Sequence, residues 1–313
     1  MEVALPTDQR LREIFLLPDA AASRARLDAR ILAARAFPPP SEPAARPAQV
    51  TATSVPEVPA AALTGPLLRE AIADSGALLV RGLLPGTHHA PLRAAIDQVL
   101  AADGKQGSPW FDPPPSLLEV MPARELATSR AFHRSSGSAM CAEAPAIAEH
   151  LLALYESLAL DDLASQCLED RPCLSVKKWV LRRSHLAVEE AGWHQDGAFM
   201  GAGIQSINLW LPLTDCGADT GAPGLDIVPA RIDGLLRDGE GTFDWSVSPA
   251  FVKRELPPWQ SPRFAAGDAL FFDHFFLHRT QYRAHFSRPR YAVETWFFAE
   301  SRAPANQVPL SWR

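Results

Sequence analysis

Two histidines and one aspartate in this chain have the types and spacing of a metal-binding set. His194 and Asp196 stand one residue apart, directly before Gly197, and His278 lies far downstream. If the first two end a strand, their side chains project to the same side, and Gly197 lets the chain turn away after them. Two imidazoles and a carboxylate occupy one face of an octahedron and leave three positions open. Such a site suits iron(II), which then also takes a bidentate organic acid and dioxygen.

A second histidine competes for the downstream position. His274 lies four residues before His278 and on the same face if residues 269–273 continue as a strand. Arg290 follows twelve residues after His278 and opens an apolar stretch that is expected to be a strand. The residue pattern alone leaves both histidines open as ligands.

Helices that must support this site are expected in the first half of the chain. Thr64 precedes apolar residues at helical spacing, Gly76 stands where a helix C-cap would, and the short buried strand 77–81 follows. Residues 104–135 contain three consecutive prolines with several Gly and Ser, and are expected to be loop with little regular structure. The expected helices are residues 8–36, 64–75, about 87–102 and about 144–158.

Short strands separated by turn signals are expected from about Leu174 onward. Helices first and strands later predict helices packed outside a β core, which is an antiparallel sandwich or barrel. The expected strands are residues 175–183, 205–213, 226–229, 269–273 and 291–299. Residues 38–59 contain seven prolines. We therefore expect residues 1–60 to form a helical arm with a Pro-rich connector, and residues 61–313 to form the main domain.

Composition excludes several classes of protein. Charged residues make up 21% of the chain and the formal net charge is −6, so we expect no nucleic-acid partner. The chain shows neither a secretory signal nor an apolar run that could span a bilayer, so we expect no membrane partner. Its four cysteines form no CxxC pair. Buried reduced thiols in a cytoplasmic protein are therefore expected.

The ordered set of motifs resembles the phytanoyl-CoA dioxygenase family of iron(II)/2-oxoglutarate-dependent oxygenases. The resemblance implies a mainly β fold with flanking helices, in which the core is a double-stranded β-helix (a cupin-like jelly roll). It implies His194, Asp196 and His278 as metal ligands, since the family's spacing from Gly267 favours His278 over His274. It covers about residues 64–299, and the matching segments are Ala77–Pro85, Trp193–Asp196, Asn208–Asp215, Gly267–Asp273 with Leu277-His278, and Arg290–Val293.

The resemblance also implies the residues that bind the co-substrate. It assigns Arg290 to the distal carboxylate of 2-oxoglutarate, which a planar guanidinium can bind bidentately. The charges of iron(II), Asp196, 2-oxoglutarate and Arg290 then cancel, which avoids burying an uncompensated ion. Arg288 competes for this role, but Pro289 denies that segment a ladder hydrogen bond, so Arg290 is preferred. Trp210 matches a family position near the cofactor, and a core tryptophan is the alternative for it.

The activity implied is oxidation of a small molecule by dioxygen, with release of succinate and carbon dioxide. Asp196 favours hydroxylation of an unactivated C–H bond, because halogenases of this superfamily lack the carboxylate ligand. Desaturation, epimerisation or cyclisation with the same cofactors is the alternative. A zinc hydrolase and a non-catalytic jelly-roll binding protein are the rivals from other classes. The substrate and the oligomeric state are not readable.

The chain departs from the family in one loop. Members often carry Val-Pro-Gly-Ser-His where this chain has Val-Pro-Ala-Arg-Ile at residues 228–232. Since none of the replaced residues is a metal ligand, the chemistry is expected to survive. Arg231 is expected to be either an ordinary solvated arginine or a substrate contact.

Overall fold

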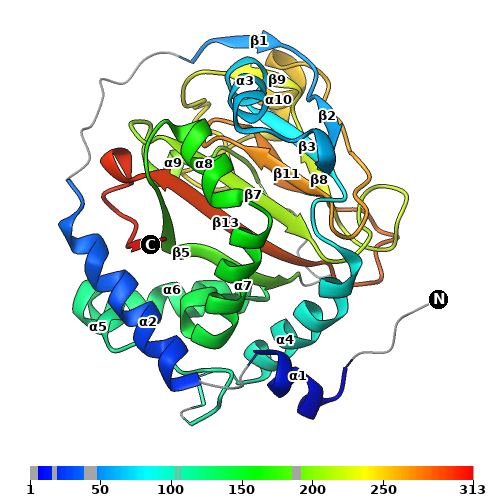
Figure 1. The fold of residues 1–313 in the computed structure, drawn as a ribbon. Helices are drawn as coiled ribbons and strands as arrows, with labels where there is room; N and C mark the ends of the chain where they lie inside the picture. Colours follow the sequence, from blue (N-terminus) through cyan, green and yellow to red (C-terminus); the bar gives the residue numbers. More distant parts are fainter. Residues whose placement is uncertain are drawn as a thin grey trace.

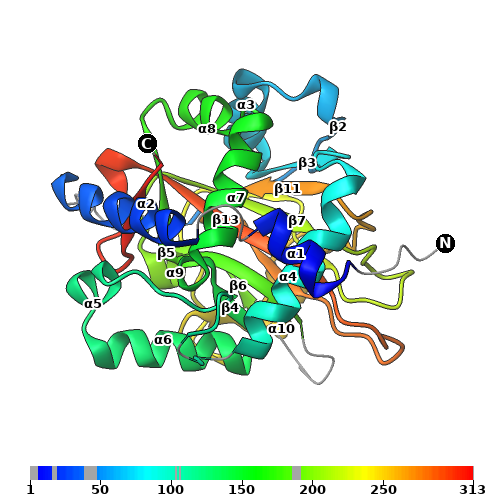
Figure 2. The ribbon, with the colours of Figure 1, turned by 60° about the horizontal axis from the view of Figure 1, so that its bottom comes forward.

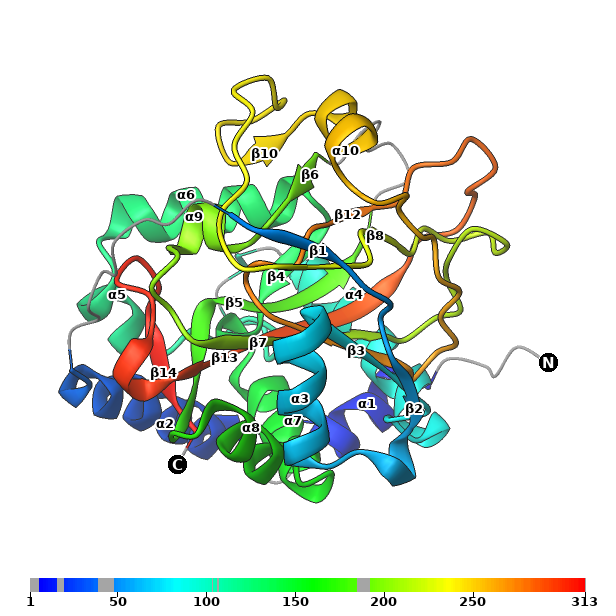
Figure 3. The same ribbon diagram turned by 90° about the horizontal axis from the view of Figure 1, so that it is seen from above.

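The computed structural model describes residues 6–15, 20–38, 48–102, 104–105, 107–184 and 192–312. Its helices and strands form three layers, which Figure 3 shows from above: a smaller sheet, a larger sheet and a layer of helices. The helices are α1 (Asp8–Phe15), α2 (Ala20–Ala33), α3 (Gly65–Ser75), α4 (His89–Ala102), α5 (Ser116–Val120), α6 (Ala123–Ser135), α7 (Pro145–Ser157), α8 (Leu160–Leu168), α9 (Gly197–Met200) and α10 (Pro249–Glu255).

The strands run mostly antiparallel in the described part of the chain. The strands that coincide with a strand expected from the sequence are β3 (Ala77–Arg81), β5 (Pro172–Arg183), β7 (Ser206–Pro212), β8 (Leu225–Ile227), β11 (Ala269–Phe272) and β13 (Tyr291–Ala299). The others are β1 (Val50–Ala52), β2 (Glu57–Pro59), β4 (Ser138–Met140), β6 (Trp193–His194), β9 (Ala230–Ile232), β10 (Ser246–Val247), β12 (His278–Thr280) and β14 (Pro309–Ser311).

In both main sheets, most neighbouring strands are not consecutive in the sequence. The larger sheet has eight strands in the order β14-β5-β13-β7-β11-β3-β2, with β4 beside β5 and with β2 parallel to β3. The smaller has four in the order β10-β6-β12-β8. Its strands come from segments far apart in the chain, as their colours in Figure 3 show. Figure 1 shows strands of the larger sheet, in which β13, β7, β11 and β3 lie side by side. The expectation of a β core with helices outside it is therefore confirmed.

Alternation along β13 separates the two faces of the larger sheet. Val293 and Phe297 belong to the core beneath the helices, whereas Glu294 and Trp296 face the cavity between the sheets. On the helical side, the buried Tyr155 of α7 shares a 2.6 Å hydrogen bond with Thr295. Because α7 lies across β13 in this way, the sheet keeps its other face for the site (Figure 2).

The N-terminal helices pack against the helical layer. Leu27 and Ile31 of α2 are fully buried, and Arg26 and Arg30 both pair with Glu149 of α7. The domain boundary at residue 60 stays a prediction. None of the described helices combines the length and apolar character that crossing a bilayer needs. All four cysteines are buried and free of disulfides.

The expectation of irregular structure over residues 104–135 is confirmed for the described residues before Ser116 and is wrong for the rest of the range. Helices α5 and α6 occupy its second half, and each begins directly after a proline, Pro115 or Pro122. Proline is tolerated at a helix start, since the first amides have no partner within the helix. In α6 only Leu126 and His133 are buried, so the apolar periodicity that reveals a helix is almost absent.

Candidate metal centre

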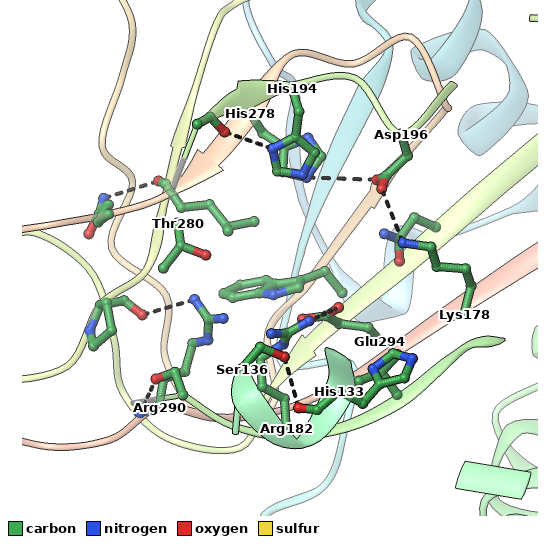
Figure 4. A pocket seen from close by; sticks show the side chains of 18 of the residues that line it. His133, Ser136, Lys178, Arg182, His194, Asp196, His278, Thr280, Arg290 and Glu294 are labelled. Atoms are coloured by element: carbon green, nitrogen blue, oxygen red, sulfur yellow. Dashed lines mark hydrogen bonds and ion pairs between the residues drawn. The ribbon is translucent and has the colours of Figure 1, made fainter. Parts of the chain in front are cut away.

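Three side chains that are distant in the sequence meet between the two sheets. His194 ends β6 and His278 begins β12, and these residues are direct partners in the pairing of the two strands. Their ring centroids are 4.4 Å apart. One ligand atom each from His194, Asp196 and His278 lies within 4.8 Å of the other two, and Figure 4 shows all three pointing to one spot.

Asp196 reaches this spot by a different route from the one expected. Strand β6 ends at His194, and Asp196 has the helical backbone angles φ −62° and ψ −25° at the start of α9. The expected alternation along one strand is therefore wrong. A turn directly after the strand brings the carboxylate back toward the histidines, and Asp196 Oδ2 lies 3.8 Å from His278 Nε2.

Hydrogen bonds orient both histidine rings toward this spot. Nδ1 of His194 donates to the carbonyl of Gly192 at 2.9 Å, and Nδ1 of His278 donates to the carbonyl of Phe276 at 3.1 Å. A carbonyl only accepts, so each ring carries its proton on Nδ1 and turns the lone pair of Nε2 toward the site. Burial, helped by the neighbouring His278 ring, lowers the pKa of His194 to about 4. The imidazole is thus neutral, as a metal ligand must be.

Gln195 anchors the segment between the first two ligands. Its buried amide nitrogen donates to the carbonyls of Gly234 and Phe275, at 2.9 and 2.7 Å, and its oxygen accepts from the backbone of Leu236 at 2.7 Å. One side chain therefore ties the ligand segment to two separate loops. These three hydrogen bonds fix the conformation of the chain directly before Asp196.

Gly197 is required for close packing rather than for a turn of unusual conformation. Its φ angle is not among the positive values of the described residues. A Cβ atom at this position would lie 3.0 Å from both the ring and the carbonyl oxygen of His274, and 3.1 Å from Leu235. The amide of Gly197 donates to that same carbonyl at 2.8 Å. The glycine therefore lets the ligand turn lie directly against the His274 backbone.

A substitution tests this packing. We expect Gly197→Ala to lower the free energy of unfolding by about 1–3 kcal/mol, the usual effect of overpacking, and to weaken iron(II) binding because the Asp196 turn must shift. Gly86→Ala is the control, since a Cβ atom there meets nothing within 4 Å. Denaturant unfolding and metal titration of both variants provide the measurements. Equal iron(II) affinity in the two variants would show that the turn does not position Asp196.

His274 has a supporting place outside the ligand group. It is buried, and its Nδ1 shares a 2.9 Å hydrogen bond with the hydroxyl of Ser206. Of the two histidines that the residue pattern left open, His274 is therefore not the one whose ring meets His194 and Asp196. Its backbone and ring hold Gly197, as described above.

Arg290 is a buried cation at the other end of the same cavity. It is 1% exposed, and its Nη1 donates to the carbonyls of Pro223 and Gly224 at 3.2 Å. Its guanidinium lies 5.2 Å from the ring of Trp210. Burial lowers its pKa to about 10. No carboxylate of the described residues lies within ion-pair distance of it, so an anion supplied by a ligand fits this position.

Unpaired polar atoms mark the same place. Arg290 Nε and Trp210 Nε1 are buried donors without a partner among the described residues, and both side chains line the cavity. Because both donors line the cavity, they are available to an acceptor that enters it. The cavity has a volume of about 570 Å³. The five residues that the sequence assigned to the metal and the co-substrate all line it: His194, Asp196, His278, Arg290 and Trp210. The donor set therefore fits a metal ion with a dicarboxylate beside it.

Sequence reasoning missed three charged residues in this cavity. Arg182 on β5 and Glu294 on β13 form a bidentate pair at 2.5 and 3.0 Å, and Lys178 on β5 lies 3.9 Å from Asp196. Burial raises the pKa of Glu294, but the positive charge of Arg182 outweighs this effect and lowers the pKa to about 2. A signal existed, since Lys178 and Arg182 share one face of a strand at a spacing of four, and Glu294 is a lone charge in an apolar strand.

Neither expectation for Arg231 is correct. Its guanidinium pairs with the buried carboxylate of Asp273, at the end of β11. Arg231 pairs with Thr51 in the β1–β9 ribbon, so it joins that ribbon to the larger sheet. Arg231 is thus a structural contact between the ribbon and the larger sheet.

No family model and no curated protein matches this chain. EctD from S. alaskensis, solved with 2-oxoglutarate and 5-hydroxyectoine, is 15% identical over 85% of this chain and 88% of its own, with a TM-score of 0.52. The epimerase SnoN, solved with Fe3+, alpha ketoglutarate and nogalamycin RO, is 16% identical over 75% and 83%, with a TM-score of 0.49. The likeness to EctD shows that this chain is similar to it in overall fold.

Proposed function

We propose that this chain is a phytanoyl-CoA dioxygenase-like, iron(II)/2-oxoglutarate-dependent oxygenase with a double-stranded β-helix core. Its reaction is hydroxylation of an unactivated C–H bond in a small molecule. One observation carries the proposal: a 2-His-1-carboxylate group and a buried arginine without an acidic partner line the same cavity. The fold shared with EctD, whose structure contains 2-oxoglutarate, supports it.

Each residue has a defined task in this function. His194, Asp196 and His278 hold the metal on one face and leave the opposite positions open. Arg290 binds the distal carboxylate of 2-oxoglutarate, and Trp210 packs against the guanidinium. When bound, iron(II) and 2-oxoglutarate supply the reduction of dioxygen that oxidises the substrate and releases succinate and carbon dioxide. Phe272 and Trp296 form apolar walls that exclude water from this reaction.

Anaerobic titration tests the proposal directly. We expect a weak visible charge-transfer band only when iron(II) and 2-oxoglutarate are both present, because the co-substrate must bind the metal through its keto acid end. Zinc(II) in place of iron(II) is the control and gives no band, since its d shell is full. Admitting oxygen should consume the band and release succinate. No band at saturating iron(II) would instead support a hydrolase or a non-catalytic binding protein.

A further inference from the structure

Lys178 is the cation in this cavity whose charge the proposed centre leaves without a partner. Its ammonium lies 3.9 Å from Asp196 Oδ1, the one ion-pair contact of this side chain among the described residues. It also lies 4.0 Å from the centre of the Phe199 ring. The side chain is 24% exposed, and that exposure is toward the cavity that it lines. Figure 4 shows it directly beside Asp196.

The charges around Lys178 can be balanced one by one. Those of iron(II), Asp196, 2-oxoglutarate and Arg290 cancel in the proposed complex. Arg182 and Glu294 cancel each other as a bidentate pair. Once the Asp196 charge is used in the metal centre, one positive charge remains on Lys178. A substrate that fills the cavity displaces the water around this ammonium, so it must bring a negative charge to avoid a large desolvation cost.

A continuous aromatic wall leads from Lys178 to the surface. The rings of Phe199 and Trp245 meet edge to face at 5.8 Å, and Trp245 stacks on Phe243 with centroids 4.6 Å apart and planes 6° from parallel. Phe243 is 46% exposed. An exposed cluster of large apolar side chains that continues into a cavity is typical of a binding surface. The wall favours a flat, apolar body next to the charged group.

We propose that the substrate, given the function proposed above, is a monocarboxylic acid with an apolar, planar body. Lys178 binds its carboxylate, and Phe199, Trp245 and Phe243 contact its body. A single unmatched positive charge favours a carboxylate over a phosphate dianion. Since Lys178 touches the metal ligand Asp196, the carboxylate sits close to the metal, and the C–H bond that reacts lies near the carboxylate.

Three small molecules of similar shape, which differ in the charge of one end group, test whether the site prefers a negative charge. Calorimetric titration of the anaerobic protein, saturated with iron(II) and 2-oxoglutarate, would compare 3-phenylpropanoate, 3-phenylpropanamide and 3-phenylpropylamine. We expect the carboxylate to bind at least about tenfold more tightly than the amide, because a hydrogen bond between two charged groups is the stronger one, and the amine to bind most weakly. Lys178→Met should remove the preference for the carboxylate, and Lys178→Arg should restore most of it.

The neighbouring lysine provides a matched control. Lys177 lies on the opposite side of β5, where it pairs with Glu125 and donates to the carbonyl of Asn306. Lys177→Met should keep the preference for the carboxylate. Equal affinities, no binding by any probe, or a preference that survives in Lys178→Met would overturn the inference. These results differ from failure of the proposed function, because that failure removes the charge-transfer band from the unsubstituted protein before any probe is added.

Discussion

Replacing His278 with glutamine is expected to abolish both iron(II) binding and 2-oxoglutarate-dependent release of succinate. The imidazole supplies one of three ligands, and its Nε2 is free because Nδ1 is bonded to the carbonyl of Phe276. Substitutions of residues that merely orient metal ligands weaken binding about 10–100-fold, so removal of a ligand should exceed about 100-fold. Equilibrium titration with iron(II) under anaerobic conditions measures the loss, and circular dichroism checks that the variant is folded.

His274→Gln is the matched control for this prediction. It changes the same residue type four positions earlier, also in a buried place, and glutamine can keep the hydrogen bond to Ser206. We expect this variant to bind iron(II) within about tenfold of the unsubstituted protein, at the low end of the range for orienting residues, because the backbone carbonyl that holds Gly197 is kept. If His274→Gln loses iron(II) and His278→Gln retains it, the downstream ligand is misassigned.

The sequence alone predicted that His194, Asp196 and His278 lie together. It did not predict the backbone turn that brings Asp196 to the two histidines. A His-x-Asp group and a later histidine are local patterns, and they mark side chains that a β core can unite. The turn at Asp196 depends on contacts that are remote in sequence: Gln195 binds the loops at Gly234 and Phe275, and Gly197 lies against His274. No periodicity within residues 193–197 indicates these partners.

The pairing of strands within the larger sheet likewise escaped the sequence. No sequence pattern places Glu294 beside Arg182, and only the register of β13 against β5 and β7 shows that they share one buried face with Trp210. Strand 291–299 was predicted with its observed bounds, because nearly all of its residues are apolar. Helix α6 was missed for the opposite reason, since it buries almost nothing. Elements with a clear apolar pattern are therefore readable from the sequence, and elements without one are not.

Arg290→Met should leave iron(II) binding intact and raise the concentration of 2-oxoglutarate needed for half-saturation. Truncating one partner of a buried, hydrogen-bonded charge pair costs about 2–5 kcal/mol, a factor of about 30 to several thousand in affinity. Arg288→Met is the control, because Arg288 is exposed at the surface two residues earlier. Titrating the charge-transfer band with 2-oxoglutarate measures both variants. An unchanged requirement in Arg290→Met, or an equal rise in Arg288→Met, would show that Arg290 does not anchor the co-substrate.

A loss of affinity in Arg290→Met cannot be ascribed to a weakened fold. Without a ligand, the guanidinium is a buried charge with carbonyls but no carboxylate of the described residues beside it, and the lowered pKa of about 10 reflects that cost. Replacing such a charge with an apolar side chain of similar length is often neutral or stabilising. We therefore expect the ligand-free variant to melt no lower than the unsubstituted protein. A chain that keeps an uncompensated cation buried at the expense of stability does so for the anion that will occupy the site.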